Sequence, residues 1–147
     1  EIALSCDLRI AGEESRFSTP EINLGLIPGG GGTQRLSRLV GYGKAMEMIL
    51  GGEMINAQEA LSIGLVNHVH PTGELEAATL HLARNIASKS LHTLKVAKAT
   101  IRAALEHPLD KGITMEADAF AGLFDSEDKE IGVKAFLERQ DPEWVGR

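Results

Sequence analysis

The sequence predicts an α/β protein in which short strand–helix units come first and an all-helical segment follows. Up to about residue 70, short stretches alternate apolar and polar residues with period two and are bounded by Gly, Pro or Ser. After Pro71, apolar residues recur at helical spacing over much longer runs. We therefore predict a boundary near Pro71, which separates residues 1–70 from residues 71–147.

Composition narrows the class of protein. Of the 147 residues, 43% are hydrophobic and 24% are charged, as in an ordinary globular protein. The net charge of −6 argues against a nucleic-acid-binding protein, which needs a basic face. No apolar run approaches the roughly 18 residues of a membrane-spanning helix. The lone Cys6 cannot form an internal disulfide, so we expect a reducing compartment and a buried, inert thiol.

The first part of the chain is predicted to consist of short elements. In chain order, we expect the end of a helix at 1–6, strands at 7–11 and 16–18, a tight glycine loop within 23–32, helices at 33–40 and 44–50, a short helix capped by Asn56, and a strand at 65–70. Thr19-Pro20 favours an extended or turn conformation just before Glu21.

The second part is predicted to be helical throughout. The expected helices span 74–89, 91–106, 111–124 and 127–140, and the last one ends before Pro142. On the second of these helices, Leu94, Ala97, Ile101 and Leu105 fall on one face. Asp128 is expected to act as a helix cap or turn former.

Two glutamates are candidates for acid–base chemistry. Glu21 follows Pro20 and precedes a glycine loop, and Glu1 opens the sequence. A carboxylate on a turn is ordinarily a solvated surface residue. Two carboxylates held together could instead bind one water and share its protons, as acid–base chemistry near neutral pH requires. Spacing alone does not bring these two together.

The segment from Ile27 to Arg35 contains four consecutive glycines, Gly29 to Gly32. A phosphate-binding loop would need Lys and Ser or Thr after the last glycine, and neither is present. A dinucleotide fingerprint would need a strand directly before the glycines, and Pro28 disfavours a strand at that position. Two interpretations remain open: backbone N–H groups that face a ligand at a helix N-terminus, or glycines required only for close packing.

Metal and serine-nucleophile chemistry have little support. His68 and His70 would share one strand face, but no carboxylate or cysteine pair stands near them, so a structural or surface role is favoured and no metal is predicted. No Gly-x-Ser-x-Gly motif occurs, which disfavours an α/β-hydrolase triad.

The residues from the start of the chain to Leu36 resemble the signature of the crotonase (enoyl-CoA hydratase/isomerase) family. The matching positions are Cys6-Asp7, Phe17, Pro20-Glu21, Gly25, Pro28-Gly29 and Gly31–Leu36. Ile55–Val69 is similar to a later family segment that ends in Gly-Leu-Val, and Phe120–Arg139 resembles the family's C-terminal helix pair. The resemblance covers essentially the whole chain.

The resemblance implies a ββα spiral core, of which this chain carries the C-terminal part in residues 1–70, followed by helices in 71–147 that build a trimer or a dimer of trimers. It implies acyl-CoA thioester substrates, no metal or redox cofactor, and an oxyanion hole made by backbone N–H groups outside these residues. It also implies no nucleic-acid or membrane partner, and location in the cytoplasm, or in the mitochondrial matrix of a eukaryote.

The resemblance further implies hydration of a trans-2-enoyl-CoA to a 3-hydroxyacyl-CoA, because isomerase-type relatives commonly keep only one of the two glutamates. Glu1 would mainly activate water and Glu21 would mainly handle the α-carbon proton. Gly29 would line the water site, and Phe120 and Arg139 would contact substrate. Arg139 stands where some members carry a coenzyme-binding Lys. An isomerase, a hydratase specialised for branched or dicarboxylic acyl groups, and a non-catalytic assembly subunit remain alternatives.

Overall fold

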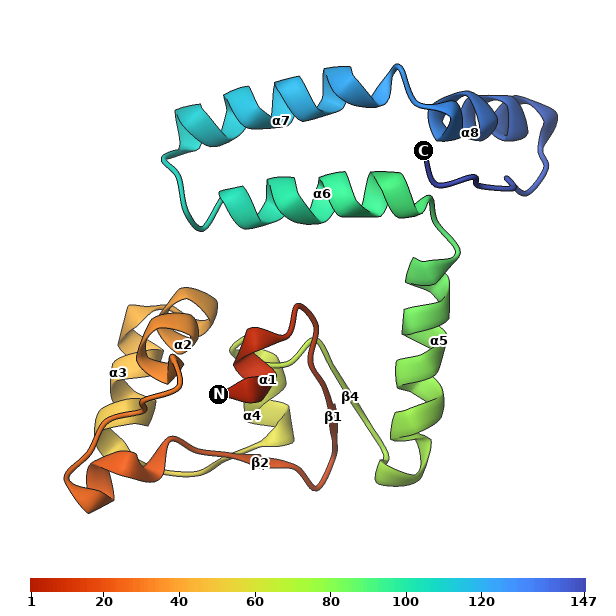
Figure 1. Ribbon diagram of the computed structural model, residues 1–147. Coiled ribbons are helices and arrows are strands. Elements are labelled where there is room, and N and C mark those ends of the chain that lie inside the picture. The colour runs from red at the N-terminus through yellow and green to blue at the C-terminus, as the bar shows by residue number, and fades with distance from the viewer. The chain divides into compact units, whose positions relative to one another are not determined.

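The computed structural model describes residues 1–147 and shows two compact units, Glu1–His81 and Leu82–Arg147 (Figure 1). The division falls within helix α5 (Leu75–Ala87). The change from mixed to helical structure comes slightly earlier, after strand β4 (His68–His70). That change lies close to the boundary near Pro71 that the sequence predicts.

The first unit contains short helices and short strands. Besides β4 and the first part of α5, it comprises α1 (Ile2–Ser5), β1 (Ile10–Gly12), β2 (Arg16–Phe17), the 3-10 helix η1 (Pro20–Leu24), α2 (Gly32–Val40), α3 (Tyr42–Gly51), β3 (Ile55–Asn56), α4 (Ala57–Ser62) and the 3-10 turn η2 (Thr72–Glu74). Strand β1 pairs in parallel with β4, and β2 pairs antiparallel with β3. The predicted helices at 33–40 and 44–50 are confirmed as α2 and α3.

The strands predicted at 7–11 and 65–70 are shorter than expected. The reason lies at Arg9 and Asn67, where the Asn67 side chain takes the place of a backbone carbonyl in the pairing of the two strands. The Arg9 N–H donates to Asn67 Oδ1 at 2.8 Å, and the Asn67 N–H donates to the Arg9 carbonyl at 2.7 Å. The Arg9 Nε also donates to the Leu65 carbonyl at 2.7 Å. Regular pairing therefore begins only at Ile10 and His68.

The core of the first unit is small and apolar. It comprises Ala11, Leu36, Ala45, Met48, Ile49, Ile55, Ala57, Ala60, Leu65 and Val66. Leu36 is the largest apolar side chain that is fully buried, so α2 is fixed against this core by its second turn. The predicted Asn56 cap is confirmed, because its Oδ1 accepts the Glu59 N–H at 2.9 Å and starts α4. The glycine segment before α2 is thereby anchored to a packed helix.

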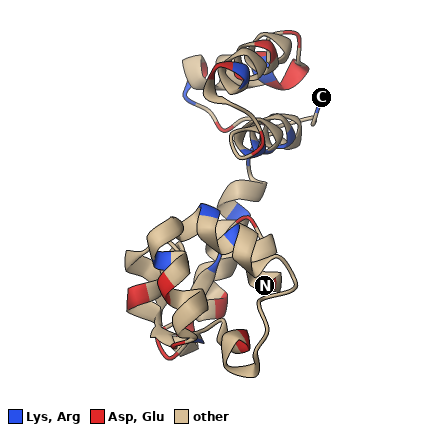
Figure 2. Cartoon of the chain, turned by 90° about the vertical axis from the view of Figure 1, so that its left-hand side faces the viewer, with Lys and Arg blue, Asp and Glu red and all other residues tan.

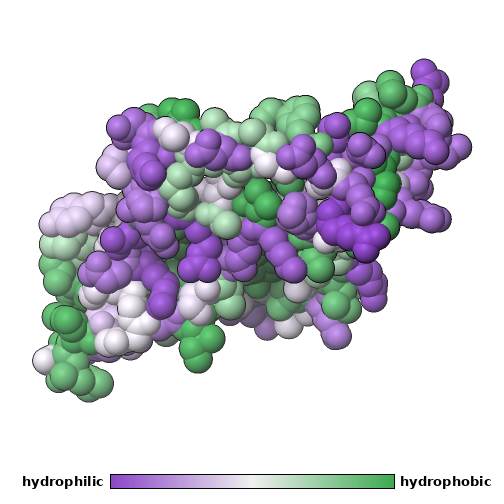
Figure 3. Space-filling model, turned by 45° about the horizontal axis from the view of Figure 1, so that its top comes forward, coloured by the Kyte–Doolittle hydropathy of each residue, from purple (hydrophilic) through white to green (hydrophobic).

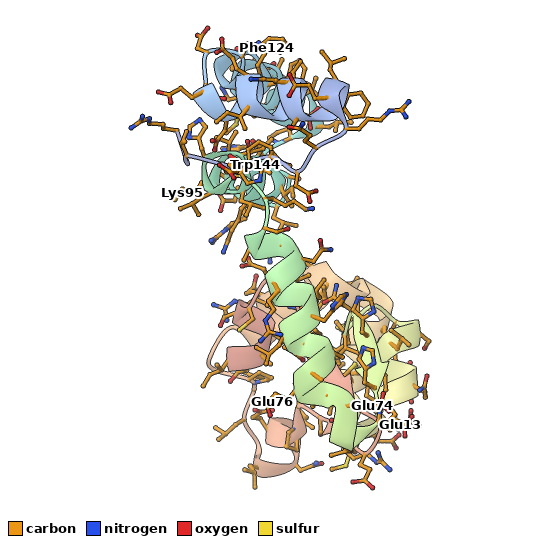
Figure 4. The ribbon with its side chains drawn as sticks, turned by 90° about the vertical axis from the view of Figure 1, so that its right-hand side faces the viewer. Glu13, Glu74, Glu76, Lys95, Phe124 and Trp144 are labelled. Carbon is orange, nitrogen blue, oxygen red and sulfur yellow. The ribbon has the colours of Figure 1, made fainter.

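The second unit is built from α6 (Leu91–Ala103), α7 (Leu109–Leu123) and α8 (Glu127–Glu138). Helices α6 and α7 lie side by side and run antiparallel (Figure 1). After α8 the chain returns as an extended segment, in which Trp144, labelled in Figure 4, donates from Nε1 to the Ser88 carbonyl at 2.9 Å. The helices predicted after Pro71 are confirmed, with ends that differ by a few residues.

Asp128 was expected from the sequence to act as a helix cap or turn former, but this residue caps no helix. Ser126 caps α8 by accepting the Lys129 N–H, and Asp128 is buried inside the first turn. The Asp128 carboxylate accepts hydrogen bonds from Ser90 Oγ at 2.5 Å and from the backbone N–H groups of Val145 and Gly146. The residue therefore fastens the chain's last segment to the starts of α6 and α8.

The second unit presents much apolar surface to solvent. Ala103 and Ala135 are its only buried apolar residues, whereas Phe136 is 83% exposed. Other exposed large apolar side chains on these helices, or just after their ends, are Leu91, Ile101, Leu105, Leu109, Ile113, Phe120, Phe124, Val133 and Leu137. Figure 3 shows apolar surface interspersed with hydrophilic side chains. None of the helices combines the length and apolarity needed to cross a membrane.

Candidate functional site

The glycine segment before α2 is shaped by two residues in the left-handed region. Gly25 ends η1 with φ of 72°, and Gly31 precedes α2 with φ of 97°. An L-residue with a side chain rarely adopts these angles, so glycine is required at both positions. Glu21 lies in η1, directly before this segment, and its carbonyl accepts the Leu26 N–H at 3.1 Å.

The carboxylate of Glu1 lies against the other end of the segment. Its Oε1 accepts the N–H groups of Gly30 and Gly32, both at 2.7 Å. Gly32 is the first residue of α2, so the carboxylate occupies the position where the helix dipole and free N–H groups favour an anion. The backbone N–H groups at this helix N-terminus are therefore directed at a side chain of the chain itself.

The glycines are also required for steric reasons. A Cβ at Gly30 would lie 2.8 Å from Glu1 Oε2, and one at Gly32 would lie 2.9 Å from Glu1 Oε1 and 2.7 Å from Pro28 Cβ. A Cβ at Gly31 would overlap the guanidinium of Arg35. Close packing and N–H donation, the two interpretations that the sequence leaves open, therefore both apply to these glycines.

Arg35 contacts the glycine segment, and this residue was not singled out from the sequence. Its Nη1 donates to the Gly30 carbonyl at 2.7 Å, and its backbone N–H donates to the Gly31 carbonyl at 2.9 Å. The residue is exposed and lies in the first turn of α2. A basic residue in the first turn after a glycine run is the one signal that could have drawn attention to it.

Glu21 differs from Glu1 in its surroundings. The residue is half-buried, and its Oε2 is shielded from solvent with no hydrogen-bond partner. A buried polar atom without a partner is unusual in a folded protein and calls for an explanation. The structure contains no hydrogen bond between the carboxylates of Glu1 and Glu21, so it brings both to the borders of the glycine segment without joining them.

A cavity of about 440 Å³ adjoins Glu1. Its walls are mostly apolar and come from α1, β1, β2 and the core, with Leu4, Phe17 and Leu36 among the lining residues. Leu36 belongs to α2, so that helix borders the same cavity as Glu1. Glu21 is not among the lining residues, and the expectation that both carboxylates bind one water stays a prediction.

The three residues expected to contact substrate are all exposed but lie in different units. Gly29, in the first unit, has open space around the position of a Cβ. Phe120 lies on α7 and meets Phe124 edge to face, with ring centroids 5.2 Å apart. Phe124 is labelled in Figure 4, and Lys129 Nζ lies 5.3 Å from its ring centroid. Arg139 ends α8 with φ of 57°, the only non-glycine residue with positive φ. Their role in substrate binding stays a prediction.

The structure also shows the surroundings of Cys6 and of the two histidines. The expectation that Cys6 is buried is wrong: α1 has no buried residue, and the Cys6 thiol is exposed. The rings of His68 and His70 are 6.2 Å apart, and no group of three or more His, Cys, Asp or Glu side chains is arranged to hold a metal. Basic and acidic residues are interspersed along the chain, as the colours of the cartoon in Figure 2 show.

Comparison with known proteins identifies the family. The profile of the enoyl-CoA hydratase/isomerase family matches residues 1–147. The chain belongs to this family. It is 44% identical over 144 residues to the probable mitochondrial enoyl-CoA hydratase of Dictyostelium discoideum, covering 98% of the chain and 52% of that protein. It is also 44% identical over 147 residues to the 2,3-dehydroadipyl-CoA hydratase of Escherichia coli, covering 100% of the chain and 58% of that protein.

Solved structures of family members share the fold. The enoyl-CoA hydratase of Bacillus anthracis superposes with a TM-score of 0.95 at 40% identity, over 98% of this chain and 56% of that one. This likeness confirms the predicted α/β crotonase-like fold. The chain spans between about half and three fifths of the length of the relatives that it matches.

Proposed function

We propose that the protein containing these residues hydrates trans-2-enoyl-CoA thioesters to 3-hydroxyacyl-CoA, with Glu1 and Glu21 as its acid–base pair. One observation carries the proposal. On the borders of one glycine segment, the Glu1 carboxylate is held by two N–H groups at 2.7 Å, and the Glu21 carboxylate has a shielded oxygen without a partner. A site that adds water across a double bond needs both a fixed proton acceptor and a proton donor.

Glu1 is suited to activating the water. Only its Oε1 accepts hydrogen bonds from the glycine segment, so Oε2 is left to accept a proton from a water. The two N–H donors restrict the carboxylate to one orientation, which keeps Oε2 aimed in one direction as the water reacts. As the water oxygen bonds to the β-carbon, its proton passes to Glu1.

Glu21 is suited to the second proton transfer. In the proposed step it begins protonated and delivers its proton to the α-carbon, as the electron pair of the double bond moves to that carbon. One water is added in total: its hydroxyl to the β-carbon and one proton to the α-carbon. The two carboxyl groups then return to their starting state by exchanging a proton.

The alternatives within the family differ in their use of water and in their acyl group. An isomerase moves a proton between two carbons and adds no water. A hydratase for dicarboxylic acyl groups is suggested by the name of the E. coli relative, whose sequence is as similar as that of the D. discoideum relative. A non-catalytic assembly subunit would bind partners without turnover. We favour hydration because both glutamates are present.

We further propose a homotrimer, or a dimer of trimers, assembled through the helices of the second unit. The exposed apolar side chains of α6, α7 and α8 support this proposal, since solvent-exposed apolar surface of this extent drives association. Light scattering coupled to size-exclusion chromatography should give three or six times the subunit mass, and a monomer at micromolar concentration would overturn the assembly.

The remaining expectations are also proposals. Hydration changes no net oxidation state, so we propose that no redox cofactor takes part. We also propose that no metal takes part, because the two glutamates are the proposed proton acceptor and donor. For the compartment we propose the cytoplasm, or the mitochondrial matrix in a eukaryote, as the name of the D. discoideum relative suggests. Cell fractionation with an antibody against this chain would test the compartment.

The activity is tested by incubating the protein with crotonyl-CoA. Hydration removes the conjugated thioester, so its ultraviolet absorbance should fall, and mass spectrometry should find the acyl-CoA heavier by one water. Parallel reactions with 2,3-dehydroadipyl-CoA and with a 3-enoyl-CoA separate the specialised hydratase and the isomerase. Conversion of the 3-enoyl-CoA alone would replace hydration by isomerisation, and no conversion of any thioester would favour the assembly subunit.

A further inference from the structure

Arg35 and Glu1 bind the glycine segment from different sides. Glu1 contacts the segment at Gly30 and Gly32, and the guanidinium of Arg35 lies against Gly31. A Cβ at Gly30 or Gly32 would displace Glu1, and a Cβ at Gly31 would displace Arg35. We propose that Arg35 is a positioning residue for Glu1, which sets the orientation of the N–H groups that hold its carboxylate.

The hydrogen bonds around Gly30 show how the positioning works. The Gly30 N–H donates to Glu1 Oε1, and the Gly30 carbonyl accepts from Arg35 Nη1, both at 2.7 Å. These groups belong to the two peptide planes on either side of the Gly30 Cα. Fixing both planes fixes the φ and ψ of Gly30, a residue that otherwise has great conformational freedom.

Arg35 is itself well anchored for this task. Its backbone N–H donates to the Gly31 carbonyl at 2.9 Å, so main chain and side chain of one residue hold successive carbonyls of the segment. The next residue, Leu36, is 1% exposed and fixes this turn of α2 in the core. A planar guanidinium presents its N–H donors in a fixed fork, whereas a lysine ammonium is a point charge on a flexible stem.

Arg38 provides a matched control on the same helix. It is exposed like Arg35, and its Nη1 donates only within α2, to the carbonyl and Oε1 of Gln34 at 3.0 and 3.3 Å. Replacing Arg38 by Met removes the same charge from the same helix and leaves the glycine segment untouched. Arg35→Met and Arg38→Met therefore differ in the contact to Gly30.

The inference rests on the proposed role of Glu1, so two readouts are needed. The first is the kcat and KM for crotonyl-CoA of the unaltered protein, Arg35→Met, Arg35→Lys and Arg38→Met. The second is hydrogen–deuterium exchange of peptides that contain Gly30 to Gly32, which does not depend on turnover. Circular dichroism shows whether each variant folds. If Arg35→Met does not fold, the comparison of Arg35→Lys with the unaltered protein decides the question.

We expect Arg35→Met to lower kcat about 10-fold or more with KM little changed, because a misplaced catalytic group slows the chemical step more than binding. Arg35→Lys should fall between Arg35→Met and the unaltered protein. Exchange in the glycine segment should be faster in Arg35→Met, and Arg38→Met should match the unaltered protein in both readouts.

The possible failures can be told apart. Equal behaviour of Arg35→Met and Arg38→Met in both readouts would overturn the positioning role. Faster exchange in Arg35→Met with unchanged kcat would also overturn it, because the segment would then loosen without consequence for Glu1. An unaltered protein that hydrates no enoyl-CoA would instead contradict the proposed function, and faster exchange confined to Arg35→Met would still support the effect on the segment.

Discussion

Ser90 Oγ donates a 2.5 Å hydrogen bond to Asp128 Oδ2 and thereby joins the starts of α6 and α8, 38 residues apart in sequence. The same Ser90 oxygen accepts the Thr93 N–H that caps α6. Asp128 in turn holds the returning chain through the N–H groups of Val145 and Gly146, at 2.8 and 3.1 Å. A single buried carboxylate thus joins three segments of the second unit.

We predict that Asp128→Asn destabilises the chain. Asparagine keeps the shape but replaces one acceptor oxygen with an NH₂ group, so donors from Ser90 or the returning segment lose their acceptor. Thermal unfolding should show Tm lowered by roughly 5 °C or more. Glu127→Gln is the matched control, because Glu127 is exposed and its ion pair with Arg147 is a surface contact. Equal Tm values for the two variants would contradict the structural role of Asp128.

The contribution of Asp128 should depend on pH. Burial is the largest single influence and raises its pKa, but the hydrogen bonds from Ser90, Val145 and Gly146, together with the positive charge of His92, leave the pKa below its ordinary value of 3.8. A carboxyl group whose pKa is lowered in the folded state stabilises the folded chain at any pH above the ordinary pKa of that group. This stabilisation is lost as the pH falls through the folded-state pKa.

Measurements of Tm between pH 3 and pH 7 test this dependence, with Asp128→Asn as the reference that cancels the other carboxylates. The difference in Tm between the unaltered chain and Asp128→Asn should be constant near neutral pH and should shrink below about pH 4. A difference that grows on acidification would show that the pKa of Asp128 is raised instead.

We predict that Gly32→Ala lowers the kcat for hydration and has little effect on the stability of the fold. The new Cβ would lie 2.9 Å from Glu1 Oε1 and 2.7 Å from Pro28 Cβ, so the carboxylate must leave its two N–H donors. A misplaced base should cost about 10-fold to 100-fold in kcat. Gly43→Ala in α3 is the control, since nothing lies within 4 Å of its Cβ position. Steady-state kinetics that show equal kcat for the two variants would contradict the proposed placement of Glu1.

Much of the fold is predictable from the sequence because helices depend on local spacing and caps. Leu36 and Leu39 mark α2, and Asn56 starts α4 as expected. The strands are less predictable: the link between Arg9 and Asn67 uses a side chain, and alternation of apolar residues gives no sign of that. Cys6 follows the four-residue helix α1, none of whose residues is buried, and its thiol is exposed as well.

The candidate site is predictable in its residue types but not in its contacts. The family motif singles out Glu1 and Glu21 by position. That Glu1 accepts two N–H groups of the glycine segment follows from the path of the backbone over about 30 residues, which no local pattern encodes. The role of Arg35 was missed because an exposed arginine on a helix is ordinarily a solvated residue.

The acid–base pair is tested most directly by the kcat for crotonyl-CoA hydration of Glu1→Gln, Glu21→Gln and the double variant, in the protein that contains these residues. Each single change should lower kcat by about 10²- to 10⁴-fold, the usual contribution of a positioned acid or base. The double variant should lose far less than the product of the two losses, because both groups are proposed to act in the addition of one water. Full activity in either single variant would contradict the assignment, and losses that multiply would show that the two carboxylates act independently.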